Sequence, residues 1–401
     1  TGIVGATVVT MGLLSLPTML KNGYNPKLAS GVITAAGTLG QIIPPSIVLI
    51  LLGDVISNAY QKSQLSMGIF SPDTVSVGDL FAGSLLPGLL LVSFYIIYQL
   101  IKASFDPLSA PINEDTNTDK SYKDLLRALF PPLSLIIAVL GSILTGFATP
   151  TEAASVGAIG AILLATNRIT NEKLGTKIAA ISFIFLLVLN FFFDLRLNRS
   201  ELINYEIFTI ILSLVILTTF LVSTIFCIYK LYLSKILTDA ARSSTKITSM
   251  VFIILVGATF FSLVFRGLGG DETIENFLMN LPGGTFSAIL VVMITMFLLG
   301  FFLDFIEITF VVVPIVAPVV LQMGIDPVWL GVMMAINLQT SFLTPPFGFA
   351  LFYLRGVAPD TVKTSEIYKG VIPFILIQIL MLILLSLFPA IATWLPNLIF
   401  G

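Results

Sequence analysis

Residues 16–46, LPTMLKNGYNPKLASGVITAAGTLGQIIPPS, and residues 317–347, APVVLQMGIDPVWLGVMMAINLQTSFLTPPF, are two copies of the stretch that decides the fold. An offset of 301 residues aligns them without a gap, and five of the six identities are proline or glycine. The identical pairs are Pro17 and Pro318, Leu20 and Leu321, Gly23 and Gly324, Pro26 and Pro327, Pro44 and Pro345, and Pro45 and Pro346. Because proline and glycine decide where a helix can break, the chain specifies the same backbone event twice.

Each copy predicts a helix that is interrupted near its middle. A short apolar run ends at a Gly-x-Asn/Asp-Pro turn, and the next apolar run carries a Pro-Pro pair in its second half. Two adjacent prolines remove two backbone donors, so 28–52 and 328–354 should both be discontinuous helices. Ordinary proline kinks in membrane helices are the alternative, and they would explain one copy taken alone. Two copies in register favour a secondary transporter whose binding site lies between the repeats.

The composition places the chain among multispanning membrane proteins. Hydrophobic residues make up 56% and charged residues 10% of the chain, and its mean hydropathy is +1.02, values far from those of a soluble domain. The sequence has no histidine and one cysteine, Cys227, which excludes disulfides within the chain, histidine-containing zinc sites and cysteine–histidine catalysis. It also contains no Gly-Lys-Ser/Thr phosphate loop, so ATP is not the direct energy source in this chain.

The apolar segments and the loops between them predict an all-α polytopic membrane protein. Most segments reach the roughly 20 residues that span hydrocarbon. The polar run 300–307 between two segments indicates the tip of a re-entrant hairpin, and 3–20 holds the equivalent place in the first copy. We therefore expect an inverted-repeat transporter with two re-entrant hairpins and two discontinuous helices. In chain order the predicted units are the first repeat of a transport domain, with a hairpin remnant and a broken helix (1–52), a scaffold helix with a cytoplasmic loop (53–127), helices around a Thr-Pro-Thr-Glu break (128–177), a peripheral helical hairpin (178–246), a linking helix (247–282), the second repeat of the transport domain (283–369) and a C-terminal scaffold helix (370–401).

The distribution of Lys and Arg predicts the orientation in the membrane. If loop 21–27 is cytoplasmic, sixteen of the twenty Lys and Arg residues fall on the cytoplasmic side. Loops 53–78 and 269–282 then lie outside, with Lys62 and Arg266 near them. The same orientation puts the two Gly-x-Asn/Asp-Pro turns on opposite faces, which an inverted repeat requires.

Polar residues beside the two Pro-Pro pairs are the candidate ligands of a sodium ion. A desolvated sodium ion needs several oxygen ligands, which an unwound helix supplies as free carbonyls, while half-helix N-termini attract a substrate carboxylate. The alternative, that small polar residues only let helices pack closely, stays open for each residue. Substrate contacts are predicted for Thr38, Asp304 and Thr340. The first sodium set is Gly37, Thr38, Gly40 and Ser46, facing Gly2 and Gly5; the second is Asn337, Gln339, Thr340, Ser341 and Thr344, facing Gly300 and Asp304.

Two acidic motifs need separate interpretations. Asp304 and Glu307 lie within hydrophobic sequence, where an ionisable group is costly unless it is paired or serves a transport pathway. We therefore predict a site role for Asp304 above all. Thr149-Pro-Thr-Glu152 instead has the spacing of a capping box, with proline at the first helical position, so capping is favoured there over ion binding.

Four motifs, in this order, resemble the large membrane subunit of the TRAP transporters, the tripartite ATP-independent periplasmic transporters. They are GTLGQIIPPS (37–46), GFATPTEAASVGAIGA (146–161), GFFLD (300–304) and NLQTSFLTPPFGFALF (337–352). The resemblance covers nearly the whole chain, and the extra segment 178–230 is similar to the longer variety of this subunit. In the family, a small-residue polar run begins the first hairpin just before the position of Thr1, so the protein is expected to have an N-terminal part that precedes this sequence.

The resemblance implies a sodium-coupled, elevator-type importer of small organic carboxylates in a bacterial inner membrane, with sodium as the coupling ion. It also implies two protein partners, a periplasmic substrate-binding protein and a small four-helix membrane subunit.

Two other functions remain as alternatives. A membrane-embedded enzyme would need a nucleophile with a base or paired catalytic carboxylates, and only Asp304 and Glu307 lie close together in apolar sequence. A passive channel would show flux that neither saturates with substrate nor depends on a sodium gradient.

Overall fold

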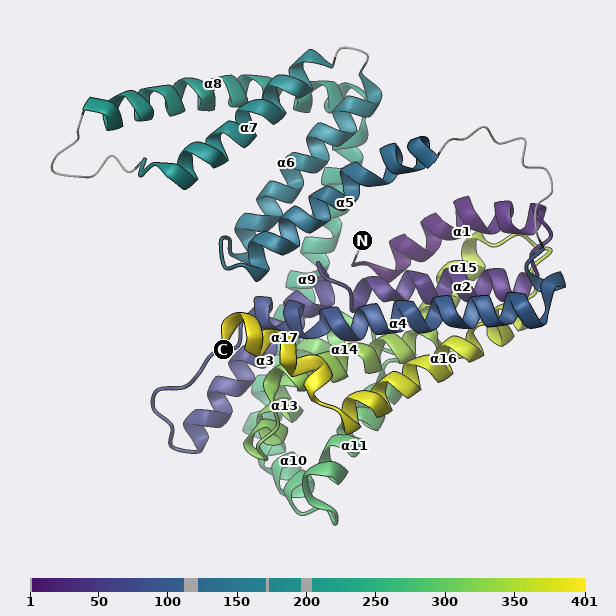
Figure 1. The fold of residues 1–401 in the computed structure, drawn as a ribbon. Helices are drawn as coiled ribbons and strands as arrows, with labels where there is room; N and C mark the ends of the chain where they lie inside the picture. Colours follow the sequence, from purple (N-terminus) through teal and green to yellow (C-terminus); the bar gives the residue numbers. More distant parts are fainter. Residues whose placement is uncertain (1, 112–121, 171–172, 196–203) are drawn as a thin grey trace. The chain divides into compact units, whose positions relative to one another are not determined.

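The computed structural model describes residues 2–111, 122–170, 173–195 and 204–401, and the regular elements in these ranges are all helical. Seven of the described helices are long and apolar enough to cross a membrane. The chain is therefore an all-α polytopic membrane protein, as the sequence predicts. It divides into two compact units, which are described separately: a larger unit of Thr1–Asp119, Ile143–Phe147 and Val251–Gly401, and a smaller unit of Lys120–Ser142 and Ala148–Met250 (Figure 1).

The larger unit contains the two sequence copies and the helices that surround them. Its elements are α1 (Val4–Lys21), α2 (Pro26–Thr38), η1 (Leu39–Gln41), α3 (Ile47–Ser66), α4 (Val77–Phe105), η2 (Pro107–Ser109), the C-terminal part of α9 (Ile236–Gly267), α10 (Gly270–Met279), α11 (Gly284–Leu299), α12 (Phe305–Glu307), η3 (Ile308–Val312), α13 (Val313–Gln322), α14 (Pro327–Leu343), α15 (Phe349–Val357), α16 (Thr364–Leu387) and α17 (Ala390–Phe400).

Helix α14 is the centre of this unit. Every residue from Pro327 to Leu343 is buried, so the helix has no exposed face, and its few polar residues, Asn337 and Gln339 to Ser341, are buried with the apolar ones. It packs against α2, α3, α4, α11 and α16 (Figure 1). Its Trp329 indole N–H donates to the Leu385 carbonyl of α16 at 2.8 Å. The second copy therefore supplies the core around which the other helices assemble.

Both predicted helix interruptions are present. In the first copy α2 ends at Thr38, the short η1 follows, and α3 begins only at Ile47, after Pro44 and Pro45. In the second copy α14 ends at Leu343 and α15 begins at Phe349. Both Pro-Pro peptide bonds are cis. Each break interrupts the helical hydrogen bonding next to the residues that the sequence predicts as ion ligands.

The segment around residue 300 turns sharply between two helices. Helix α11 ends at Leu299, residues 300–303 form a turn, and a new helical segment starts at Phe305. This segment passes from α12 through η3, which is a π-helix, into α13. π-Helical segments inside α-helices are rare and occur often at functional sites.

Helices α2 and α16 approach each other more closely than side chains would allow. A Cβ added at Gly31 would lie 2.6 Å from the carbonyl carbon of Gly370, and one added at Gly370 would lie 3.1 Å from the Gly31 nitrogen. Small residues permit such close backbone contact between membrane helices. The crossing of α2 with α16 therefore depends on glycine at both positions.

The smaller unit is a helical assembly of α5 (Tyr122–Leu144, up to residue 142), α6 (Pro150–Ile169), α7 (Leu174–Phe192), α8 (Asn204–Leu233) and the N-terminal part of α9. Helices α7 and α8 pack along each other, with Phe183 stacked on Phe220 at 5.5 Å between ring centroids. The predicted capping box of α6 is confirmed: the Thr149 backbone N–H donates to Glu152 Oε2 at 2.8 Å, and the Glu152 N–H donates to Thr149 Oγ1.

In the larger unit, three elements differ from the sequence-based expectation. Helix α3 continues to Ser66, inside the expected outer loop 53–78, because apolar residues such as Ile56 and Ala59 still face the core after the fully apolar run ends. Helix α10 lies within the expected loop 269–282. The expected single C-terminal helix is two helices, since α16 ends before Pro389, and a residue that precedes proline is disfavoured in helical conformation.

Helix α4 supplies a test of the predicted orientation. Its 29 residues extend about 43 Å, enough to reach from one side of a bilayer to the other. In a Cys227→Ala background, Ser71→Cys in the loop before α4 should react with a membrane-impermeant maleimide added outside, and Ser104→Cys near the end of α4 should react only after permeabilisation. The reverse labelling pattern would show that the charge-based orientation is wrong. Much of the loop expected to be cytoplasmic, 112–121, lies outside the described residues.

Candidate functional site

The first break is lined by the residues that the sequence predicts. Thr38 is fully buried, and its hydroxyl donates to the Ala35 carbonyl at 2.8 Å. Ser46 is also buried; its hydroxyl donates to the Gln41 carbonyl at 2.6 Å and accepts from the Leu49 N–H. The backbone of η1 and residues 42–46 is thereby folded back on itself, with Gly40 partly exposed.

The start of the chain packs against this break, as predicted. A Cβ added at Gly2 would lie 3.2 Å from the Ile47 nitrogen and 3.6 Å from the Ser46 Cα. Farther along α1, Val8 lies directly against Gly37, where a side chain would collide with it. Gly5 has a different neighbour, because a Cβ there would lie 2.9 Å from the Tyr353 ring of α15.

The second break has a similar lining. The hydroxyls of Thr340, Ser341 and Thr344 each donate to a carbonyl three or four residues earlier, at 2.7 to 2.8 Å. Asn337 donates its amide N–H to the Met293 carbonyl of α11 at 2.8 Å. Gly300 lies directly against the Ser341 hydroxyl, so the predicted contact between the hairpin turn and the second break is present.

The two breaks meet at one pair of equivalent residues. The Gln339 amide N–H donates to Thr38 Oγ1 at 3.3 Å, and the two residues are separated by the 301-residue offset of the sequence copies. Both side chains are fully buried. The two predicted ligand sets are thus joined by one buried hydrogen bond, which the sequence alone did not establish.

Asp304 has a structural role that the sequence analysis missed. Its Oδ1 accepts from the Phe305 N–H at 2.7 Å, and Glu307 Oε2 accepts from the Asp304 N–H at 2.7 Å. Asp304 therefore caps the helical segment that begins at α12. The Asp-x-x-Glu spacing is the same signal that identified the cap at Thr149 and could have found this one.

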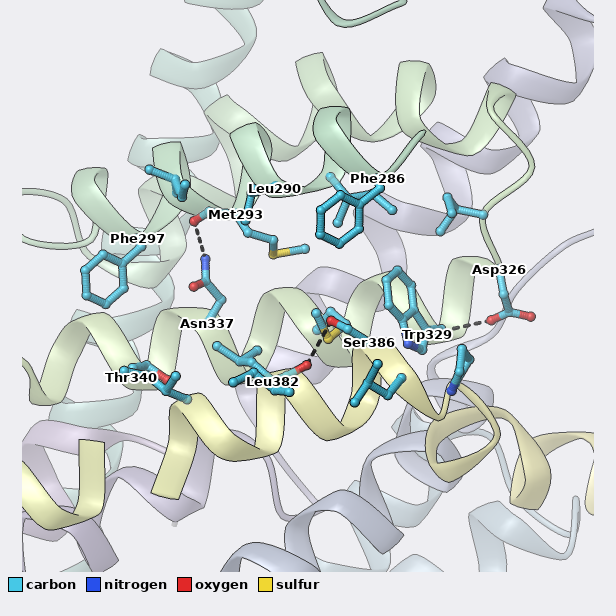
Figure 2. A pocket seen from close by; sticks show the side chains of 18 of the residues that line it. Phe286, Leu290, Met293, Phe297, Asp326, Trp329, Asn337, Thr340, Leu382 and Ser386 are labelled. Carbon is cyan, nitrogen blue, oxygen red and sulfur yellow. Dashed lines mark hydrogen bonds between the residues drawn. The ribbon is translucent and has the colours of Figure 1, made fainter. Parts of the chain in front are cut away.

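A cavity of about 880 Å³ lies between α11, α14 and α16 and adjoins the second break. Figure 2 shows Asn337 and Thr340 near one end, Asp326 and Trp329 near the other, and apolar side chains such as Leu290 between them. No Lys or Arg of the described residues lines it, and neither do Thr38 and Asp304. The cavity alone is therefore poorly suited to hold a carboxylate, and the three predicted substrate contacts do not converge on it.

Two further buried polar residues were not predicted as site residues. Gln41 in η1 is fully buried, and neither atom of its amide group has a hydrogen-bond partner among the described residues. Thr309 in η3 is buried, and its hydroxyl has none either. The Gln339 Oε1 is also buried without a hydrogen-bond partner among the described residues. A buried polar atom without a partner is costly, so these atoms are available to a bound ion, water or ligand. A glutamine three residues before a double proline was the signal that could have found Gln41.

The chemistry available at the breaks is that of neutral oxygen donors. Among the described residues, no three His, Cys, Asp or Glu side chains gather in a way that could hold a metal ion. Hydroxyls, amide oxygens and backbone carbonyls are ligands for hard cations. The arrangement offers oxygen ligands of the kind that hard cations take, and Asp304 is the one carboxylate among the predicted ligands.

Comparison with known proteins gives a consistent result. The family model described as "Tripartite ATP-independent periplasmic transporter, DctM component" matches residues 1–391. The C4-dicarboxylate TRAP transporter large permease protein DctM of Vibrio cholerae is 28% identical over 397 residues, 99% of this chain and 74% of the relative. The ectoine TRAP transporter large permease protein TeaC of Halomonas elongata is 26% identical over 100% of this chain and 74% of its own length. The sialic acid TRAP transporter permease protein SiaT of Haemophilus influenzae is 24% identical over 97% of this chain and 50% of its own length.

Proposed function

Since the chain belongs to the DctM component family of the tripartite ATP-independent periplasmic transporters, we propose that it carries a small organic carboxylate across a bacterial inner membrane together with sodium ions. The family consists of transport proteins, so the chain is a transporter component rather than an enzyme. The Gln339–Thr38 contact, which joins equivalent residues of the two broken helices, is the observation that carries the proposal.

An inverted repeat is the part of the proposal that the packing supports most directly. Helix α1 packs on α15, and its counterpart α13 packs on α3, which is the counterpart of α15. Helix α14 packs on α3. Its counterpart α2 packs on α15, which is the counterpart of α3. Exchanged pairs of this kind, with a contact between Thr38 and its own counterpart Gln339, are expected around a two-fold axis. An elevator movement of these elements against α4 and α16 belongs to the proposal.

Sodium is proposed to bind at the two breaks. The oxygens of Ser46 and the backbone around Gly37 and Gly40 would serve the first site, against Gly2. Those of Ser341 and Thr344, against Gly300, would serve the second. The support is the buried, oxygen-rich surroundings of both breaks, where unwound backbone offers carbonyls to an ion.

The substrate class and the partners are proposed from the relatives. Their names specify a C4-dicarboxylate, sialic acid and ectoine, all small carboxylates. Transporters of this family work with a periplasmic binding protein and a small membrane subunit. We expect this chain to receive its substrate from such a binding protein and to be held by such a subunit.

Uptake measurements test the proposal. Proteoliposomes with the complete subunit, its small membrane partner and the binding protein should accumulate labelled carboxylate only when sodium is higher outside, and uptake should saturate with substrate. A C4-dicarboxylate, sialic acid and ectoine are the first compounds to compare. Collapsing the sodium gradient at constant membrane potential is the control. Flux that does not saturate and ignores the gradient would identify a passive channel instead.

A further inference from the structure

A second hollow of the larger unit lies away from both breaks. It is a groove of about 630 Å³ between α3 and residues 251–266 of α9, and Phe310 and Pro314 also line it. None of the predicted sodium or substrate residues lines it. Its volume falls in the range of about 300–1,000 Å³ that is usual for ligand pockets.

The groove has a polar half and an apolar half. On α3, Asp54, Asn58 and Lys62 follow one another at intervals of four residues and so share one helix face. On α9, Thr259, Ser262 and Arg266 form a similar row. Both rows lead to the same end, because Lys62 and Arg266 meet at one carboxylate. The other half is lined by apolar side chains: Leu51, Val55, Val251, Phe252, Leu255 and Phe310.

The cations at the polar end are only partly neutralised. Lys62 Nζ lies 3.2 Å from Asp271 Oδ2, and Arg266 Nε lies 3.3 Å from the same oxygen. Two positive charges share one negative charge, so the cluster keeps an excess of one positive charge. The side chains of Lys62 and Arg266 are 50% and 53% exposed, which leaves their remaining N–H groups free to reach another anion.

The length of the groove corresponds to one leaflet of a bilayer. At 1.5 Å per residue, Leu51 to Lys62 spans about 16 Å and Val251 to Arg266 about 22 Å. Half of the hydrocarbon core is about 15 Å thick. The apolar half therefore lies at the depth of the acyl chains and the cations at the depth of the head groups. In the predicted orientation this is the outer leaflet.

The part of the chain that the structure describes leaves the apolar half largely uncovered. Only 6% of the most apolar window of α9 is buried, against 56% for the segment Phe305–Gln322 on the other side of the groove. Phe252, which lines the groove, is 62% exposed. In a bilayer such a face must be covered by lipid or by another helix.

We propose that this groove binds one anionic phospholipid, with its phosphate between Lys62 and Arg266 and an acyl chain along the apolar half. A single phosphodiester charge balances the excess charge of the cluster. The Asn58 amide and the Thr259 and Ser262 hydroxyls lie at the depth of the ester groups. Basic pockets between membrane helices recognise phospholipid head groups in this way.

Asp54 distinguishes between two possible occupants of the groove, an anionic phospholipid and a helix of another protein. It lies eight residues before Lys62, about 12 Å along the helix, so its carboxylate is well outside contact distance of a phosphate held at Lys62 and Arg266. No cation of the described residues pairs with its carboxylate. A basic helix that docked in the groove would use Asp54 as an anchor, whereas an anionic phospholipid gains nothing from it and would be bound at least as well by Asp54→Asn.

Native mass spectrometry of the purified complex with phosphatidylglycerol tests the proposal. At equal lipid concentration, the unchanged protein should retain one molecule of phosphatidylglycerol more strongly than it retains phosphatidylcholine. Lys62→Gln combined with Arg266→Gln should weaken this retention about tenfold or more, and Asp54→Asn should not. The matched control is Lys102→Gln, which removes a surface cation that pairs with Asp106 elsewhere. Equal retention by the double variant, or a loss in Asp54→Asn, would overturn the proposal.

Photo-crosslinking gives a second test, and its first arm uses the unchanged protein. Phosphatidylglycerol with a diazirine on its acyl chain should label the α9 peptide that contains residues 251–263. Labelling that avoids this peptide, or a crosslink from Ser262→Cys to the small membrane subunit, would show that the lipid does not occupy the groove.

Discussion

Asp304→Asn is expected to lower the apparent sodium affinity of uptake about tenfold or more, which corresponds to about 1.4 kcal/mol per decade. The substitution keeps the size of the side chain and removes the charge that would help offset the dehydration of the ion. In apolar surroundings the loss of such a charge is costly for a bound cation. The measurement is initial uptake against sodium concentration in proteoliposomes with equal amounts of folded protein.

The capping geometry of Asp304 makes this test selective. Asparagine is as good an N-cap as aspartate, so Asp304→Asn retains the bond to the Phe305 N–H and should leave the helix start intact. Asp304→Ala removes both the cap and the charge and should lower stability by about 1 kcal/mol as well. If Asp304 acts only as a cap, Asp304→Asn will behave as the unchanged protein and Asp304→Ala will be less stable.

Thr149→Val is the control at a cap without a predicted ion. Its capping box has the same spacing as that of Asp304, but it starts α6 in the smaller unit. The variant should lose about 1 kcal/mol of stability with unchanged sodium dependence. A larger transport defect in Thr149→Val than in Asp304→Asn would mean that the ion site has been assigned to the wrong part of the chain.

Gly370→Val is expected to prevent stable folding of the larger unit, with a loss of about 3 kcal/mol or more. The added side chain would meet the backbone of α2, where a Cβ at Gly370 already lies 3.0 Å from the Lys27 carbonyl carbon and 3.1 Å from the Gly31 nitrogen. Backbone atoms cannot move aside as a flexible side chain can, so α2 and α16 would have to separate. Gly31→Val should have the same effect from the other helix.

Thermal unfolding in one detergent measures this effect. Gly257→Ala is the matched control, because nothing lies within 4 Å of a Cβ added there. An alanine in that exposed helix position should be neutral or stabilise the protein by about 0.5–1 kcal/mol. A Gly370→Val protein that melts at the unchanged temperature would show that α2 and α16 do not cross as closely as described.

Several features could be predicted from the sequence because they depend on local chemistry. Pro44-Pro45 and Pro345-Pro346 interrupt their helices at the expected places, since proline removes a backbone donor whatever surrounds it. The cap at Thr149 followed from residue type and spacing. The helix ends at Ser66 and Leu387 did not follow from apolar runs, because a helix continues through polar turns and stops where proline intervenes.

What the sequence by itself determined is the class of the molecule, its two broken helices and the polar residues that lie beside them, because composition, proline pairs and hydroxyl groups act within a few residues. Only the tertiary structure decided which of these residues meet. The contact between Gln339 and Thr38, the lack of hydrogen-bond partners for the Gln41 amide among the described residues and the packing of Tyr353 against Gly5 depend on helix packing across hundreds of residues. Burial of a polar atom, and whether it finds a partner there, is a property of that packing and not of local sequence.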